Sequence, residues 1–313
     1  MTGATRKIGE VEVSLAGLGC NNFGMRIDEE RSFAVVDAAI DAGINHFDTA
    51  DIYGGGHSEE FLGRALGSRR GDVVITSKFG MRKPPDESIA PGSPEWVAQS
   101  VDESLKRLGT DYIDLYLLHT PDATTPIGDT LEAMSALVDA GKVREIGCSN
   151  FSAEQLDEAS SAARERGVRG FLNVQNEYSL LQREPEKGVI PACGRLGIGL
   201  VPYFPLASGM LTGKYRRGEP IPEGARLGGG DYWKPFLADE RFDQVERLTA
   251  YAADHGHTII ELALSWLATN PVVASVIAGA TRPEQVRANV AATTAWKLSD
   301  DERAEVDEIA RPA

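Results

Sequence analysis

Short apolar segments alternate with longer amphipathic segments along almost the whole chain, and this alternation limits the fold more than any other feature. The apolar segments are rich in Val, Ile and Leu and have the length of buried strands, whereas the segments between them have the length and periodicity of helices. The expected strands are residues 15–18, 44–47, 73–77, 113–118, 143–148, 171–175, 198–203 and 274–278. The expected helices are residues 29–42, 58–66, 94–108, 126–140, 153–166, 184–196, 239–255 with 258–269, and 283–292.

Strand and helix units in this order predict a parallel sheet, and eight of them predict a closed (β/α)8 TIM barrel. Glycine follows several expected helices, as at Gly43 and Gly109, and proline opens others, as at Pro94. An open doubly wound sheet that binds a dinucleotide is the main rival, but residues 17–24 lack its Gly-x-Gly-x-x-Gly pattern. We therefore expect one barrel domain over residues 1–313.

Two additions to the barrel are expected. Residues 6–13 alternate around Gly9-Glu10 and predict a short N-terminal β-hairpin, placed to cover one end of the barrel. Residues 204–238, after the seventh strand, form a long segment rich in Gly, Pro and charge, and loops of that length in a compact domain are usually functional. We expect this loop to act as a lid.

Composition excludes several classes of function. A formal net charge of −15 disfavours nucleic acid and anionic membranes as partners, because phosphate binding needs clustered cations. The cysteines, Cys20, Cys148 and Cys193, are few and scattered, which favours a reducing cytoplasm. His255 and His257 lack a third ligand, so no metal is expected. The expected partner is a small molecule, and the oligomeric state is not predicted.

Polar side chains follow the second, third and fourth expected strands. Asp48, Lys78 and His119 each top a column of alternate residues that faces the barrel interior, and Tyr53 follows Asp48 in a glycine-rich loop. Because barrel enzymes keep their active sites at the carboxyl ends of the strands, we expect these four residues to meet there.

The four side chains have complementary chemistry. A phenol has a pKa of about 10 and donates a proton poorly at neutral pH unless a cation stabilises its phenolate. Lys78 supplies such a cation, Asp48 holds Lys78, and His119 orients a substrate oxygen by hydrogen bonding. This arrangement is typical of a general-acid site for a carbonyl group, with Tyr53 and His119 in contact with the substrate.

At these residues the chain resembles the aldo-keto reductases, and the resemblance extends over nearly its whole length. The matching segments are residues 17–19, 47–54, 76–78, 111–119, 141–151, 175–178, 203–206 and 279–289. The resemblance implies a (β/α)8 barrel that binds NADP(H) without a Rossmann domain. It also implies that Tyr53 is the proton donor, that Lys78 and Asp48 tune it, and that His119 orients the carbonyl.

The resemblance further implies a set of cofactor-binding residues. Ser149, Asn150 and Gln175 match positions that hold the nicotinamide carboxamide, and Tyr203 matches the ring that stacks on the nicotinamide. The remaining cofactor positions implied are Gly19, Asp48, Phe204, Leu206, Ser208, Gly209, Leu211, Lys214, Gly279, Thr281, Arg282, Gln285 and Asn289. Two residues depart from the family pattern: Phe204 replaces a common serine, and Ala288 replaces a common glutamate.

Basic residues in these segments supply the local patch that an acidic chain needs for an anionic ligand. Lys214, Arg216, Arg217 and Arg282 form this expected patch, and Arg282 at a helix start suits a 2′-phosphate. The sequence thus predicts an NADPH-dependent reductase of aldehydes or ketones. The alternative is an NADP(H)-binding regulatory subunit with little turnover. The residues considered for an apolar substrate pocket are Phe23, Met25, Phe79, Trp96, Tyr232 and Trp233.

Overall fold

Eight parallel strands form the centre of the computed structural model, which describes residues 4–81, 84, 86 and 88–311. Along the sheet they run in the order β10, β3, β4, β5, β6, β7, β8, β9. The bounds are Ala16–Gly19 (β3), His46–Asp48 (β4), Val74–Phe79 (β5), Ile113–Leu118 (β6), Val143–Ser149 (β7), Asn173–Gln175 (β8), Gly199–Leu200 (β9) and Val276–Gly279 (β10).

The sheet closes on itself next to β9. Leu200 pairs in parallel with Val273, just before β10, and two backbone hydrogen bonds of 2.8 and 2.7 Å join Leu200 to Val272 and Ala274. Because consecutive strands are neighbours and the first and last are both paired, the predicted (β/α)8 barrel is confirmed.

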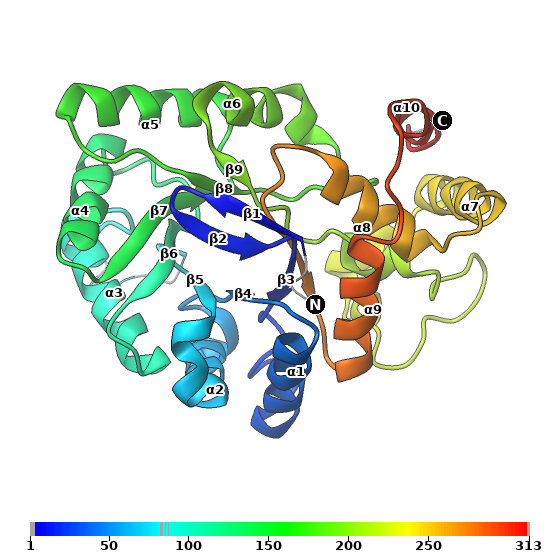
Figure 1. The fold of residues 1–313 in the computed structure, drawn as a ribbon, viewed down its shortest axis with the longest axis horizontal. Coiled ribbons are helices and arrows are strands. Elements are labelled where there is room, and N and C mark those ends of the chain that lie inside the picture. The colour runs from blue at the N-terminus through cyan, green and yellow to red at the C-terminus, as the bar shows by residue number, and fades with distance from the viewer. Residues whose placement is uncertain (1–3, 82–83, 85, 87, 312–313) are drawn as a thin grey trace.

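Helices surround the strands (Figure 1). Their bounds are Glu29–Asp41 (α1), His57–Leu66 (α2), Pro94–Leu108 (α3), Ile127–Asp139 (α4), Ala153–Arg166 (α5), Val189–Leu196 (α6), Asp239–Asp254 (α7), Ile259–Thr269 (α8), Pro283–Thr293 (α9) and Asp300–Ile309 (α10). Residues 184–187, expected as the start of the sixth helix, form a separate 3₁₀ turn.

The C-terminal helix α10 was not predicted. It begins at a capping box, in which the Ser299 side chain accepts from the Glu302 backbone N–H and Glu302 reaches back to Ser299. Its docking is polar as well as apolar: Trp266 in α8 donates to Asp307 at 3.0 Å, and Arg183 pairs with the same carboxylate at 2.9 Å. The Ser-x-x-Glu pattern at residues 299–302 could have predicted the start of this helix from the sequence.

The N-terminal hairpin lies across one end of the barrel (Figure 1). It comprises β1 (Thr5–Ile8) and β2 (Val11–Ser14), with Ile8 opposite Val11 and Gly9 at a positive φ of 56° in the turn. Its Ile8, Val11 and Val13 pack into one cluster with barrel-interior residues such as Leu115 and Leu117. The hairpin therefore fills the amino-terminal end of the barrel and leaves the carboxyl-terminal end for a ligand.

Residues 204–238 form the predicted long loop, which contains three short 3₁₀ segments: Ala207–Thr212, Arg226–Gly228 and Asp231–Leu237. Arg217 anchors the loop to α7 by ion pairs with Asp239, Asp243 and Glu246. A second set of contacts reaches the loop after β3. Arg26 donates to the Gly224 carbonyl at 2.5 Å, and Arg226 donates to the Asn22 side chain at 3.0 Å. The long loop thus crosses the carboxyl-terminal mouth of the barrel.

No helix in the described part of the chain is long and apolar enough to cross a membrane.

Candidate active site

A buried ion pair lies at the carboxyl ends of β4 and β5. Lys78 Nζ donates to Asp48 Oδ1 at 2.6 Å and to the Thr49 carbonyl at 2.8 Å, and both side chains are almost fully buried. The second carboxylate oxygen, Oδ2, accepts a 2.5 Å hydrogen bond from Gln175 Nε2. Since neither oxygen lacks a partner, the charges of the pair are held in place despite their burial.

Tyr53 lies directly against this pair. The Lys78 ammonium is 5.0 Å from the Tyr53 ring centroid, and its charge acts on the phenol. The phenol is brought there by a tight turn, in which Gly54, Gly55 and Gly56 all have positive φ angles. A side chain at Gly54 would also meet the Phe23 carbonyl at 2.6 Å, so glycine is required at that position.

The protonation states suit a proton donor. Burial raises the pKa of Tyr53, and the opposing effect of Lys78 does not cancel it, so the phenol keeps its proton at neutral pH. Burial alone would lower the pKa of Lys78, but Asp48 and Tyr53 outweigh it and raise the pKa above its ordinary value. Lys78 therefore stays charged beside a neutral phenol.

His119 lies next to the Tyr53 ring. Its ring is 5.8 Å from that of Tyr53, in an edge-to-face arrangement, and its backbone carbonyl accepts from Asn150 Nδ2 at 2.9 Å. Burial and the charge of Lys78 lower the pKa of His119 to about 3, so the imidazole is neutral at neutral pH. A neutral imidazole carries one N–H, and His119 Nδ1 is buried without a hydrogen-bond partner among the described residues.

This histidine predicts a stability change with pH. A pKa of about 3 in the folded state and about 6.5 in the unfolded chain means that the unfolded state binds more protons between these values. Stability is therefore complete above about pH 6.5 and is lost as the pH falls, by about 2–3 kcal/mol for this group at pH 4.5. Denaturant unfolding should show that a fall in pH lowers the unfolding free energy of His119→Gln less than that of the wild type. Equal losses would contradict a buried neutral His119.

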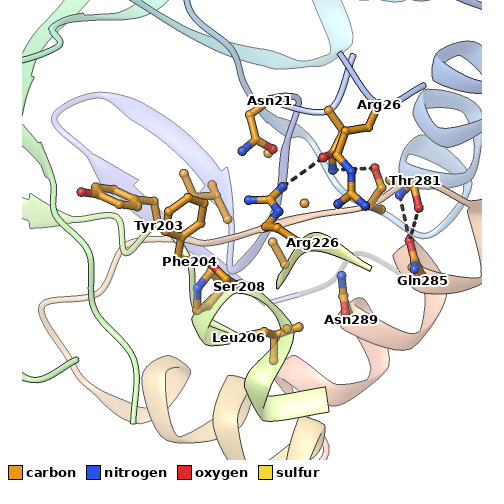
Figure 2. Close-up of a pocket in the computed structure, with 18 of the residues that line it drawn as sticks. Asn21, Arg26, Tyr203, Phe204, Leu206, Ser208, Arg226, Thr281, Gln285 and Asn289 are labelled. Atoms are coloured by element: carbon orange, nitrogen blue, oxygen red, sulfur yellow. Dashed lines mark hydrogen bonds between the residues drawn. The ribbon is translucent and has the colours of Figure 1, made fainter. Parts of the chain in front are cut away.

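A large cavity of about 910 Å³ opens at this end of the barrel and is lined by all four residues. Of the cofactor positions implied by the resemblance, every one except Leu211 lines it: Gly19, Asp48, Ser149, Asn150, Gln175, Tyr203, Phe204, Leu206, Ser208, Gly209, Lys214, Gly279, Thr281, Arg282, Gln285 and Asn289. Figure 2 shows Tyr203, Phe204, Leu206 and Ser208 along one side, and Thr281, Gln285 and Asn289 along the other.

Several expected residues do not line the cavity. The side chain of Leu211 is fully buried in the core, so its place among the cofactor-binding residues stays a prediction. Arg216 and Arg217 do not line the cavity, and each pairs with acids at the surface. Phe23, Phe79 and Trp96 also pack in the core, and Met25 and Trp233 lie outside the cavity lining. The side chain of Tyr232 lies outside the described residues.

Three other arginines take the place of the two that pair at the surface. Arg26, Arg31 and Arg226 line the cavity with Lys214 and Arg282. Within the described part of the chain, none of these five forms an ion pair with an acid. Burial lowers the pKa of Lys214, and Arg26, Arg226 and Arg282 lower it further, which shows that the cations lie close together. Unpaired cations that repel one another are held ready for an anion.

Arg226 also rests on an aromatic ring. Its guanidinium lies 5.4 Å from the centroid of Phe204, the residue that replaces a serine in the family pattern, and it donates to Asn22. Sequence reasoning missed Arg26, Arg31 and Arg226 because they sit in loops and a first helical turn, where the path of the chain decides the direction of a side chain. No regular spacing in the sequence distinguishes these three arginines from those at the surface.

These features fit a dinucleotide bound through its phosphates. Ser208, which has a positive φ of 56°, buries an Oγ that has no hydrogen-bond partner among the described residues. A side chain at Gly209 would meet Lys214 Nζ at 2.7 Å, so this position must be glycine for the lysine to approach the backbone. An unpaired hydroxyl, bare backbone and clustered cations are together the donors that a diphosphate requires.

Comparison with known proteins assigns the class. The model of the aldo/keto reductase family matches residues 16–311, so the chain belongs to this family of oxidoreductases, whose members generally bind NAD(P)H.

Individual relatives are similar over most of their length. The chain is 35% identical to an aldo-keto reductase of Bacillus subtilis over 96% of this chain and 90% of the relative. It is 38% identical to a probable voltage-gated potassium channel subunit beta of Oryza sativa, over 86% of this chain and 84% of the relative. Among solved structures, a glycerol dehydrogenase of Gluconobacter oxydans superposes with a TM-score of 0.84 at 28% identity, covering 99% of this chain and 95% of that one.

Proposed function

We propose that the protein reduces aldehydes or ketones to alcohols with NADPH, or runs the reverse reaction. The observation that carries this proposal is the neutral phenol of Tyr53, held between the Lys78–Asp48 ion pair and the neutral imidazole of His119. A carbonyl oxygen placed between phenol and imidazole accepts a hydrogen bond from each and takes the proton of Tyr53 as negative charge develops on it. A nicotinamide bound in the cavity would supply the hydride that the carbonyl carbon receives.

The protein's own residues position the reaction. Tyr203 lies in the cavity with its hydroxyl fixed by a 2.7 Å hydrogen bond to Asn150 Oδ1, so its ring would offer a fixed surface for a nicotinamide to stack on. Ser149, Asn150 and Gln175, which line the same cavity, would hold its carboxamide. Lys78 keeps its charge throughout and stabilises the phenolate left after proton transfer.

The unpaired cations favour NADPH over NADH. Lys214, Arg26 and Arg226 line the same cavity, and Arg282 is the N-cap residue of α9, so it lies at the positive end of the helix dipole. A 2′-phosphate at this helix start gains from both the helix dipole and the guanidinium, whereas NADH offers only a hydroxyl.

Fluorescence titration tests this preference. Because a hydrogen bond to a charged group contributes about 1.5–3 kcal/mol, Arg282→Ala should weaken NADPH binding about ten- to hundredfold and leave NADH binding within about a factor of two. Arg217→Ala is the matched control, since Arg217 pairs with surface acids and lies outside the cavity lining. Equal affinity of the wild type for NADPH and NADH would exclude the proposed preference.

A second function is favoured by the relatives named as probable potassium channel beta subunits. In this alternative the chain binds NADP(H) and reports the state of the cofactor to a protein partner, with little turnover. The complete set of Asp48, Tyr53, Lys78 and His119 favours the reductase. Tight NADPH binding without turnover of any carbonyl, together with a copurifying partner, would favour the regulatory role.

A further inference from the structure

The side chain of Gln175 joins two parts of the site that have separate tasks. It ends β8, is 1% exposed, and donates from Nε2 to Asp48 Oδ2 at 2.5 Å. The other carboxylate oxygen of Asp48 accepts from Lys78. With one N–H given to Asp48, the amide orientation is set, and Oε1 is the atom left to accept from a ligand in the cavity that Gln175 lines.

A second series of hydrogen bonds runs from the backbone carbonyl of Gln175, not from its side-chain amide, to the wall of the nicotinamide position. Ser149 Oγ donates to the Gln175 carbonyl at 2.9 Å and accepts from Asn150 Nδ2 at 3.1 Å. Asn150 Oδ1 accepts from Tyr203 at 2.7 Å. Gln175 is the member of this series that also contacts the ion pair beside Tyr53.

We propose that Gln175 is a positioning residue for proton transfer, which holds Asp48 against Lys78 and so couples the carboxamide position to the proton affinity of Tyr53. This inference rests on the proposed reductase function. It goes beyond the binding of a carboxamide, because it gives the Gln175 amide an effect on the phenol in the absence of any cofactor.

The charges around the phenol give the direction of this effect. The titratable groups that face Tyr53 are Lys78, Asp48, Cys20 and His119. Asp48 in turn is within electrostatic range of Lys78, Cys20 and His46. Removing the amide leaves more negative charge on Asp48, which opposes a phenolate, and it also draws the ammonium of Lys78 away from the phenol. Both effects raise the proton affinity of Tyr53.

The test replaces Gln175 with methionine, which has a similar length but no hydrogen-bond donor. We expect the pKa of the Tyr53 phenol to rise by about one unit in the cofactor-free protein. Tyrosinate absorbance, recorded in rapid pH jumps so that native protein is observed, gives this pKa. Subtracting the titration of the corresponding Tyr53→Phe protein isolates Tyr53 from the other seven of the eight tyrosines.

Ser149→Ala is the matched control. Ser149 also lines the cavity and is expected to hold the carboxamide, but it makes no contact with Asp48 in the described hydrogen bonds. A role confined to carboxamide binding predicts that both variants raise the KM for NADPH and that neither shifts the Tyr53 pKa. A shift in Gln175→Met alone supports the proposal. An unchanged or lower Tyr53 pKa in Gln175→Met overturns it.

A second variant keeps the proposal testable if Gln175→Met does not fold. Gln175→Leu also removes the hydrogen-bond donor without adding a charge, so it should raise the Tyr53 pKa in the same direction. Because the titration needs neither cofactor nor substrate, its result is separate from turnover. Turnover without a pKa shift leaves the reductase function standing and removes the coupling role of Gln175. A pKa shift without turnover supports the effect of Gln175 on Tyr53 and counts against the reductase function.

Discussion

Replacing Tyr53 with phenylalanine should lower the rate of carbonyl reduction by about 10²–10⁴-fold and leave NADPH binding within about a factor of two. The substitution removes one oxygen from a ring that already packs against Lys78 and His119, so the shape of the site is kept. The carbonyl oxygen loses its proton donor, and the neutral His119 does not replace it, because a neutral imidazole that gave up its N–H proton would become an imidazolate anion. Steady-state rates and a fluorescence titration of NADPH measure the two effects.

Tyr112→Phe is the control for this prediction. Tyr112 carries its phenol near the opposite end of the barrel, where its ring packs between the guanidinium groups of Arg70 and Arg144. Loss of that hydroxyl should not change turnover. Near-wild-type reduction by Tyr53→Phe would show that another group delivers the proton, and a parallel loss of NADPH binding would show that the Tyr53 hydroxyl is needed for cofactor binding.

Replacing Lys78 with methionine should abolish turnover and also destabilise the fold. The lysine is 1% exposed, and its removal leaves Asp48 charged and buried, with Gln175 as its one remaining side-chain hydrogen-bond partner among the described residues. Breaking a buried ion pair in this way typically costs about 3–5 kcal/mol of unfolding free energy. The phenolate also loses its cation, so the reaction is slowed in both directions. Urea unfolding and steady-state rates measure the two losses.

The double variant Lys78→Met with Asp48→Leu separates stability from catalysis. Removing both charges should recover most of the lost unfolding free energy, because no uncompensated buried charge remains. It should not recover turnover, since Tyr53 still lacks Lys78. A single variant as stable as the wild type would contradict the buried ion pair, and recovery of turnover in the double variant would contradict the role of Lys78.

The barrel could be predicted because each strand and helix carries its own signal. All eight expected strands appear in the observed sheet, since a fully buried parallel strand must be a short apolar run and glycine or proline marks many helix ends. The alternation of side chains along a strand also placed Asp48, Lys78 and His119 in one cavity. Applied consistently, it would have excluded Phe79, which follows Lys78 directly and so faces the helices.

The cation patch could not be predicted in the same way. Arg217 and Arg226 both lie in the long loop, yet Arg217 pairs with acids on α7 and Arg226 crosses the mouth of the barrel to Asn22. Four residues with positive φ that are not glycine, Asn150, Phe204, Ala207 and Ser208, shape the walls around the cavity. Such backbone angles are set by tertiary packing and leave no periodic pattern in the sequence.

The central claim is that Tyr53 and bound NADPH together reduce a carbonyl group, and one measurement tests it most directly. NADPH absorbance is followed after mixing the protein with a panel of carbonyl compounds that includes sugars and aromatic aldehydes. The wild type should consume NADPH with at least one of them, in step with alcohol formation, and Tyr53→Phe should not. Tight binding of NADPH without its consumption by any member of the panel, or equal consumption by Tyr53→Phe, would contradict the claim.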